Sequence, residues 1–299
     1  MLVLAACLLA SRAHADSAVT YQAATTTAQL TRIGVGARAE AMAGAFAGLC
    51  DDATAMYWNP AGLAQIEDAA FSLSHQTHIA GIRQEAVTFG QRLGTRAVFG
   101  LSAAFQSFGT FDGYASEHTV PVPLSATDYY GSGGIALRLP SFAFGIAAKF
   151  LRSSYESDLA GHLALDAGLL GVWSATGISI GGSVSNLEVP LKSGAAAAPA
   201  VARFGIAYPF GRLPLMIALQ GDYAFDASPA AAVGAEYWIQ NLVAVRAGYR
   251  AYLGESRLSR VVGLSAGLGV QWQGWSLSYS FQPWDDLGSS HRVTLMANL

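Results

Sequence analysis

Charge is scarce in this sequence. Charged residues make up 12% of the 299 residues and hydrophobic residues make up 52%, whereas an ordinary globular domain is roughly 25% charged. So few charges cannot cover a water-facing surface, and we therefore expect a protein that lies in a membrane. The net charge is −3 and basic residues are scattered singly. No basic cluster is available to follow a phosphate backbone, which argues against a nucleic-acid partner.

Long hydrophobic runs are also missing. A helix that crosses a membrane needs about 20 consecutive apolar residues, and the longest apolar stretch covers only residues 1–10. Without such a helix, a closed barrel is the remaining way to satisfy every backbone polar group in lipid. We therefore predict an all-β fold, a transmembrane antiparallel β-barrel whose partner is outer-membrane lipid.

The beginning of the chain is typical of an export signal. Residues 1–10 form an apolar core, and Ala13-His14-Ala15 after it fits the small-x-small pattern of a cleavage site. We predict that residues 1–15 are a signal peptide that is removed. Leu4-Ala5-Ala6-Cys7 also resembles a lipoprotein cleavage site, which is the alternative. Removal of residues 1–15 leaves Cys50 as the single cysteine, so we expect no intrachain disulfide.

From residue 69 onward, apolar residues recur at every second position, which is the period of a strand. In residues 142–150 one face carries Phe and Ile, while the other carries Ala, Gly and a single Lys. A bulky face opposite a small one suits a barrel in lipid, with the bulky face outward and the small face lining the lumen. The fourteen predicted strands are residues 69–77, 83–93, 95–106, 128–139, 142–153, 160–174, 177–187, 200–209, 213–225, 230–240, 242–253, 260–272, 274–282 and 291–298.

The connections between these strands support a bacterial outer-membrane barrel. Tight turns alternate with mostly longer connections, of which residues 107–127 are the longest. Outer-membrane barrels have short periplasmic turns and longer external loops. We therefore assign residues 69–299 to the barrel and expect both of its ends on the periplasmic side.

Residues 16–68 are Ala-rich and predict an N-terminal plug with helices at residues 37–49 and 53–58. Small residues in the first helix permit a close approach to the barrel wall. Asp51 or Asp52 is expected to cap the second helix. Because a residue before proline avoids the α region, Asn59-Pro60 should end it.

The plug segment also carries a set of short motifs, and Gly62 among them is expected to let the chain turn into the first strand. The motif positions are Gly36, Arg38, Met42, Gly44, Asp51, Asp52, Asn59, Pro60 and Gly62. Together with His291-Arg292-Val293 near the other end, they resemble the PorV/PorQ family, a branch of the FadL-like outer-membrane superfamily. Two positions depart from the family pattern, Ala43 and the final Leu299.

This resemblance implies a 14-stranded barrel in the outer membrane and an accessory role in type IX secretion. The barrel would bind secreted cargo proteins or the translocon at its mouth and external loops. The alternative is a FadL-like channel that takes up long-chain fatty acids or other hydrophobic small molecules. A purely structural barrel is the third reading.

Two groups of residues bear on these alternatives. Phe105, Phe108, Phe111 and Tyr114 are a candidate apolar access surface for a hydrophobic ligand, or an anchor at the membrane interface. The alternation also aims nine charges into the lumen, where they either pair with one another and contact the plug or line a polar conduit. These nine are Arg92, Arg138, Lys149, Asp166, Arg203, Asp222, Glu236, Arg246 and Arg250.

No motif in the sequence predicts an enzyme. Gly263-Leu264-Ser265-Ala266-Gly267 matches a nucleophile elbow, but that motif needs a strand–turn–helix and here lies within an alternating strand. His75 and His78 are three residues apart, so a strand places them on opposite faces and they cannot share a metal. We therefore predict no catalytic residue, no metal site and no cofactor.

Overall fold

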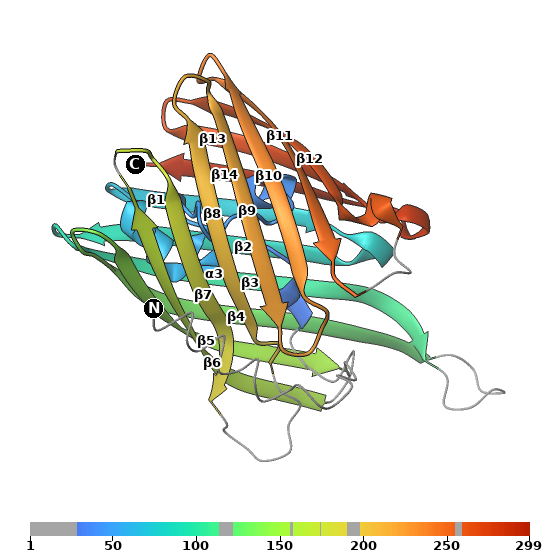
Figure 1. Ribbon diagram of the computed structural model, residues 1–299. Coiled ribbons are helices and arrows are strands. Elements are labelled where there is room, and N and C mark those ends of the chain that lie inside the picture. The colour runs from blue at the N-terminus through green and yellow to red at the C-terminus, as the bar shows by residue number, and fades with distance from the viewer. Residues whose placement is uncertain (1–28, 114–121, 156–157, 174, 190–197, 255–258) are drawn as a thin grey trace.

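The computed structural model describes residues 29–113, 122–155, 158–173, 175–189, 198–254 and 259–299. Its fourteen strands form one closed antiparallel barrel, in which each strand pairs with its neighbours in sequence and β1 closes the ring against β14. The predicted fold class is therefore confirmed. Figure 1 shows the N-terminal segment, in blue, enclosed by the strands. The proposed signal peptide lies outside the described residues.

Short turns join the strands at one end of the barrel, which we call the turn side. The remaining connections lie at the other end, which we call the loop side. Their bounds are β1 Ala69–Thr77, β2 Arg83–Leu93, β3 Ala97–Gly113, β4 Val122–Arg138, β5 Ala143–Tyr155, β6 Asp158–Val172, β7 Ser179–Val189, β8 Val201–Phe210, β9 Leu215–Ala224, β10 Ala230–Ile239, β11 Val243–Tyr252, β12 Leu264–Trp272, β13 Trp275–Pro283 and β14 Ser289–Asn298.

The third and fourth strands are longer than predicted, so the assignment of residues 107–113 and 122–127 to a loop was wrong. The β3–β4 pairing shifts register between Ser107 and Thr110 and then continues to the pair of Gly113 with Val122. Gly109 lies in this shift with φ +75°, a conformation that glycine adopts without steric penalty. A bulge of this kind absorbs the extra residues and lets the hairpin go on.

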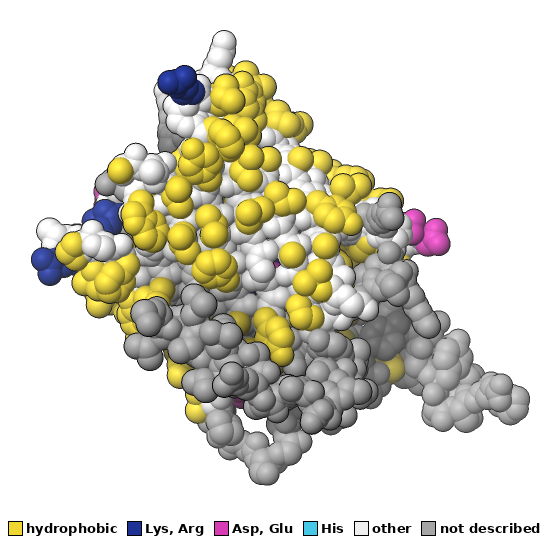
Figure 2. All heavy atoms as spheres, in the orientation of Figure 1, with side chains coloured by type: hydrophobic (Ala, Val, Ile, Leu, Met, Phe, Trp, Pro, Cys, Tyr) yellow, Lys and Arg dark blue, Asp and Glu magenta, His cyan; other side chains and the backbone are white. Residues whose placement is uncertain are grey.

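The two faces of the wall differ as the alternation predicts. On β5, Phe144 and Ile146 are exposed to the outside, whereas Ala143 and Ala147 are buried against the contents of the barrel. Figure 2 shows hydrophobic side chains spread over the outer wall. An apolar surface of this extent is unusual for a water-soluble protein and matches the lipid-facing band of a membrane barrel. No helix among the described residues is long and apolar enough to cross a membrane.

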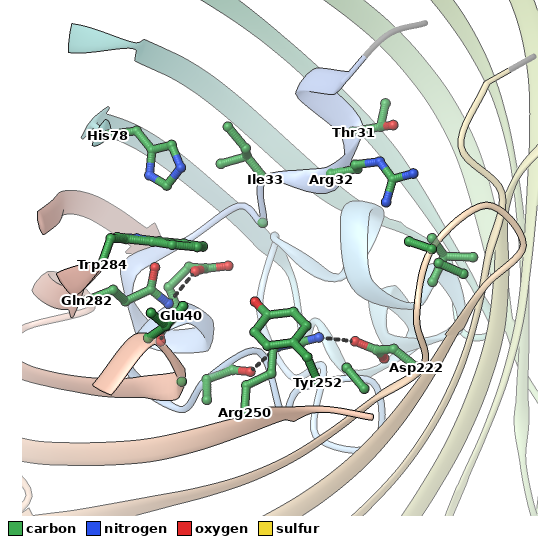
Figure 3. A pocket seen from close by; sticks show the side chains of 18 of the residues that line it. Thr31, Arg32, Ile33, Glu40, His78, Asp222, Arg250, Tyr252, Gln282 and Trp284 are labelled. Carbon is green, nitrogen blue, oxygen red and sulfur yellow. Dashed lines mark hydrogen bonds and ion pairs between the residues drawn. The ribbon is translucent and has the colours of Figure 1, made fainter. Parts of the chain in front are cut away.

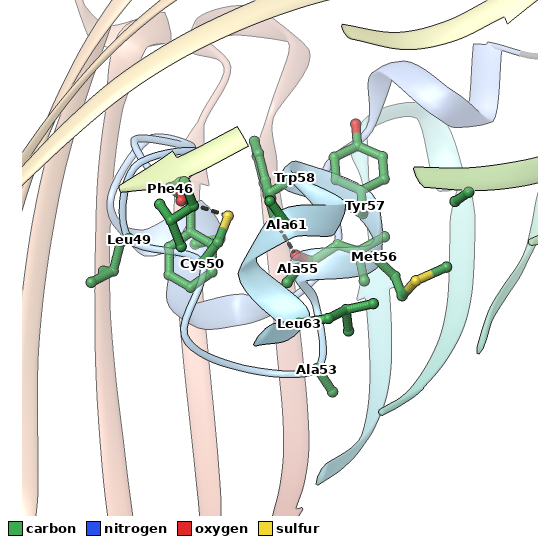
Figure 4. Packing of buried hydrophobic residues seen from close by; sticks show 14 of the residues in the cluster. Phe46, Leu49, Cys50, Ala53, Ala55, Met56, Tyr57, Trp58, Ala61 and Leu63 are labelled. Carbon is green, nitrogen blue, oxygen red and sulfur yellow. Dashed lines mark hydrogen bonds between the residues drawn. The ribbon is translucent and has the colours of Figure 1, made fainter. Parts of the chain in front are cut away.

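The N-terminal segment folds inside the barrel into four short helical pieces. They are η1 Gln29–Arg32, α2 Ala37–Ala41, α3 Ala55–Trp58 and η2 Pro60–Gln65. We call residues 29–66 the plug. Figure 4 shows how Phe46, Met56, Trp58 and Leu63 pack together in its centre. The plug supplies the apolar core that the lumen face of the wall, made of small residues, does not provide.

The prediction of one helix over residues 37–49 was wrong beyond Ala41. Ala43 and Gly44 adopt left-handed φ values of 56° and 75°, which ends the helix. A wall side chain then accepts from two backbone N–H groups of the segment. Gln220 Oε1 accepts from the backbone N–H groups of Phe46 at 3.0 Å and Ala47 at 2.7 Å. The periodicity of the plug sequence could not predict this hydrogen-bond partner, because Gln220 lies on β9.

The second predicted helix is present but starts later, at Ala55. The expectation that Asp51 or Asp52 caps this helix was wrong, because Thr54 is the N-cap residue and no side chain caps the helix. Asp52 Oδ1 instead accepts from the Thr54 backbone N–H, at 2.9 Å, just before the helix. Asn59 is extended and ends α3, as predicted. Gly62 does not turn the chain, contrary to expectation. It lies within η2, where a Cβ atom would collide with the Cys50 backbone.

Candidate functional site

The plug lies directly against the backbone of the wall. At nine inward glycines, from nine strands, an added Cβ atom would clash with a plug atom. They are Gly90, Gly100, Gly145, Gly168, Gly181, Gly205, Gly234, Gly248 and Gly267. Gly48 and Gly205 show the contact most plainly, because a Cβ on either one would lie 2.6 Å from the backbone of the other. This ring of glycines, which we call the glycine belt, holds the plug at mid-barrel.

A charged cluster ties the turn side of the plug to the wall. Arg38 lies 2.5 Å from Asp51 and 2.8 Å from Glu236, and Glu236 also pairs with Arg246 at 2.6 Å. Burial alone would lower the pKa of Arg38, but the carboxylates of Asp51, Glu236 and Asp52 raise it well above its ordinary value. Burial raises the pKa of Asp52, against the opposing effect of Arg38. Arg38 therefore stays charged and bridges plug and wall.

The remaining motif positions make plug–wall or plug–plug contacts. Met42 lies against Gly234 and Gly248. Asn59 Nδ2 donates to Ala47 O at 2.9 Å and to Leu169 O on β6 at 3.0 Å. Gly36, with φ 92°, precedes α2, and Pro60 lies against Gly145. These residues position the plug, and the structure gives them no chemical role of their own.

All nine predicted lumen charges contact the plug or one another. Four Arg side chains reach the plug: Arg92 donates to Ile66 O, Arg138 to Ala64 O and Arg250 to Ala43 O, while Arg203 stacks on Tyr57 and Trp58. The others form the pairs Glu236–Arg246, Asp222–Arg250 and Lys149–Asp166. These contacts correspond to the pairing alternative.

Sequence reasoning missed Arg292 on β14 as a lumen charge. Arg292 is 2% exposed and donates to Gln76 Oε1 and to Gly34 O in the plug. The signal was available, because Val293 and Leu295 on the same strand face outward and Arg292 has the opposite parity.

A cavity of about 590 Å³ lies between the plug and the loop side of the barrel. Tyr57 and Trp58 of the plug contribute to its lining. In Figure 3, Trp284, Gln282 and Glu40 lie on one side, and Asp222, Arg250 and Tyr252 on the other. The charges are paired, because Arg250 Nη1 lies 2.6 Å from Asp222 and Gln282 donates to Glu40 at 2.8 Å. We call this the loop-side cavity.

The loop-side cavity also has an apolar part and unpartnered polar atoms. Ile33, Phe108 and Trp284 contribute apolar surface. Gln106 is 1% exposed, and its Oε1 has no hydrogen-bond partner among the described residues, nor has Trp284 Nε1. His78 packs edge-on against Trp284, and burial lowers its pKa below the ordinary value of about 6.5. The ring is therefore neutral at neutral pH.

A second cavity of about 300 Å³ lies on the turn side of the plug. Arg38, Asp51 and Asp52 line it from the plug, and Arg246 and Ser278 line it from the wall. The plug separates the two cavities. No group of three or more His, Cys, Asp or Glu within the described part of the chain could hold a metal ion, and Cys50 is a buried free thiol.

The predicted access surface does not form one surface. Phe105 is 46% exposed and lines a groove of about 610 Å³ on the outer wall, whereas Phe108 faces the loop-side cavity. The two residues are three apart and therefore lie on opposite sides of the wall. The Phe111 side chain and Tyr114 lie outside what the structure describes.

Comparison with solved structures identifies the class of barrel. A Pseudomonas aeruginosa FadL homologue superposes with a TM-score of 0.64 at 11% identity, over 89% of this chain and 98% of that one. The Ralstonia pickettii toluene transporter TbuX gives 0.62 at 12%, over 88% and 97%. A TodX monoaromatic hydrocarbon channel mutant gives 0.61 at 13%, over 89% and 99%. The fold is therefore that of the FadL-like outer-membrane barrels.

A sequence profile then names the family. The profile described as "Uncharacterised protein family (UPF0164)" matches residues 5–156, which are 152 of the 299 residues. The chain belongs to this family. Among curated proteins, none matches the chain. The narrower PorV/PorQ assignment stays a prediction.

Proposed function

We propose that this chain is a bacterial outer-membrane barrel that takes up small hydrophobic molecules carrying a polar group. The loop-side cavity is the observation that carries the proposal. Its volume of about 590 Å³ lies within the range of roughly 300–1,000 Å³ for small-molecule sites. Export through a signal at residues 1–15 and a lipid-facing outer wall are parts of the same proposal.

The lining of the cavity suits such a ligand. Phe108 and Ile33 offer apolar contact, while the unpartnered Gln106 Oε1 is an acceptor for a hydroxyl or amine of the ligand. A buried acceptor without a partner is costly, and a ligand donor would relieve that penalty. Two barrels of the same fold are described as a toluene transporter and a monoaromatic hydrocarbon channel, which supports a hydrophobic substrate. Onward passage would require the plug to shift, because it separates the two cavities. This function needs no catalytic residue.

Phe105 and Phe108 lie on opposite sides of β3, so substitutions at these two positions provide a matched test of ligand binding in the cavity. The purified barrel in mild detergent is titrated with p-cresol, an aromatic molecule that carries a hydroxyl donor, and with a fluorescent long-chain fatty acid. Burying a Phe side chain is worth about 1.5–3 kcal/mol, so Phe108→Ser should weaken binding at least about tenfold. Phe105→Ser, on the outside of the same strand, should leave affinity unchanged. Equal effects of the two variants, or no binding of either probe, would contradict the proposal.

Type IX secretion is the second candidate. Two features support it, the plug motif set and the glycine belt. A barrel that is closed by a tightly packed plug is better suited to binding cargo at its mouth than to acting as an open pore. Cross-linking in cells would decide it. A secreted protein or translocon subunit captured on the wild-type barrel and equally on Phe108→Ser would favour secretion. If no secreted protein or translocon subunit is captured on the wild-type barrel, the secretion candidate fails.

A further inference from the structure

Three buried polar side chains meet on the inner faces of β5, β6 and β7, and none of them lines the cavities described above. They are Lys149, Asp166 and Asn186, which are 3%, 1% and 1% exposed. Lys149 Nζ lies 2.8 Å from Asp166 Oδ2 and 2.8 Å from Asn186 Oδ1. One amine thus touches a carboxylate and a carboxamide at once.

The backbone is irregular at this point, which brings the three groups together. The β6–β7 pairing shifts register between Leu165 and Ala167, so Asp166 has no ladder partner on β7 among the described pairs. Asn186 has φ 60°, a left-handed conformation that Asn tolerates better than most residues. Its backbone N–H donates to Asp166 Oδ1 at 2.7 Å. The bulge therefore fixes Asn186 beside Asp166.

The carboxamide is held with its oxygen toward the amine. Asn186 Nδ2 donates to Pro199 O at 3.0 Å, leaving Oδ1 to accept from Lys149. To react, Lys149 Nζ would have to shift from its contact with Asn186 Oδ1 to a contact with Asn186 Cγ. These two atoms of the carboxamide are bonded to each other and lie only about 1.2 Å apart. The Tyr130 ring, 5.4 Å from Nζ, covers the amine. Asp166 Oδ2, 2.8 Å from Nζ, is placed to accept a proton from the amine, and an amine that has given up its proton is a nucleophile.

We propose that Lys149 and Asn186 condense into an intramolecular isopeptide bond, with Asp166 as the proton carrier. The neutral Nζ attacks Cγ of Asn186, and a C–N bond forms. Asp166, holding the proton it took from Lys149, hands it to Nδ2 as the bond from Cγ to Nδ2 breaks, and Nδ2 leaves as ammonia. Asp166 then accepts the second proton, which Nζ loses as it becomes an amide nitrogen. The products are one secondary amide and one ammonia, and no oxidant or reductant is needed.

Such a bond would staple β5 to β7 across β6. The loop-side end of β7 needs support there, because its described pairing with β8 ends at Ser185, and only β6 pairs with the residues that follow. The bond would therefore hold a part of the wall that the hydrogen-bond ladder leaves weak. It would also explain why a Lys and an Asp are buried together in a lumen whose other charges mostly contact the plug.

The intact mass of the purified, denatured barrel tests the proposal directly. The mass should be lower than that of the mature sequence by one ammonia, and proteolysis should yield a branched peptide joining Lys149 to Asn186. Lys149→Arg keeps the positive charge but cannot be acylated by Asn186, so it should show no ammonia loss, and Asp166→Asn should likewise abolish the loss. A wild-type mass equal to that of the sequence, with a free Lys149 peptide, would overturn the proposal. Loss of water instead would assign the bond to Asp166 and would overturn the role of Asn186.

Discussion

The glycine belt makes Gly205→Ala the most informative single substitution. The new methyl group on β8 would lie 2.6 Å from Gly48 N of the plug, a separation at which atoms must move apart. Neither side can yield by a rotamer change, because both partners are backbone. Overpacking of this kind costs about 1–3 kcal/mol. At roughly 2–4 °C per kcal/mol for a large domain, the apparent Tm should fall by about 2–12 °C.

Thermal unfolding in detergent, followed by circular dichroism or gel mobility, measures this shift. Gly221→Ala on the neighbouring strand β9 is the matched control, because a Cβ there meets nothing within 4 Å. The control should leave the apparent Tm unchanged or raise it slightly. If the two variants melted at the same temperature, the plug would not be packed against the wall as described, and the argument from the belt would fail.

Two further substitutions test the polar contacts of the plug. Gln220→Leu removes the acceptor for the Ala47 N–H group, whereas the Phe46 N–H group keeps a second acceptor in Gly44 O at 2.8 Å. Unfolding should therefore require about 1–3 kcal/mol less for the one orphaned donor; an unchanged denaturation midpoint would contradict this. Asp52→Asn tests the pH dependence. Burial raises the folded-state pKa of Asp52, and the positive charge of Arg38 opposes this rise. The contribution of Asp52 to stability is therefore full below the ordinary carboxyl pKa of about 3.9. It is lost as the pH rises through the raised pKa. A series of apparent Tm values across acid pH should show this decline in the wild type and a weaker one in Asp52→Asn, and identical profiles would exclude the effect.

The barrel strands were predictable because the alternation that specifies them is local. In β5, the large apolar Phe144 and Ile146 identify the outer face, and the small Ala143 and Ala147 identify the inner face. No neighbouring strand is needed for this assignment. The extension of β3 was not predictable, because it depends on how the bulge at Gly109 pairs with β4. Cross-strand geometry of that kind has no signature in a single strand's periodicity.

The interior was only partly predictable. The lumen charges follow from strand parity, and the same rule applied to Phe105, Phe108 and Arg292 would have separated the first two and found the third. The path of the plug could not be read from its own sequence. Residues 37–49 favour helix locally. Backbone hydrogen bonds donated to Gln220, a hydrogen bond donated by Arg250 and the close approach of wall glycines determine the fold there. Tertiary contacts override weak helix propensity in such short segments.

The central claim is that the bulky face of each strand contacts lipid and the small face encloses the plug. Fluorophores attached at Leu268→Cys, an outward position, and at Ser278→Cys, which lines the turn-side cavity, test it in liposomes. A quencher carried on lipid acyl chains should quench the label at position 268 strongly and the label at position 278 weakly. Equal quenching of the two labels, or stronger quenching at position 278, would contradict the account.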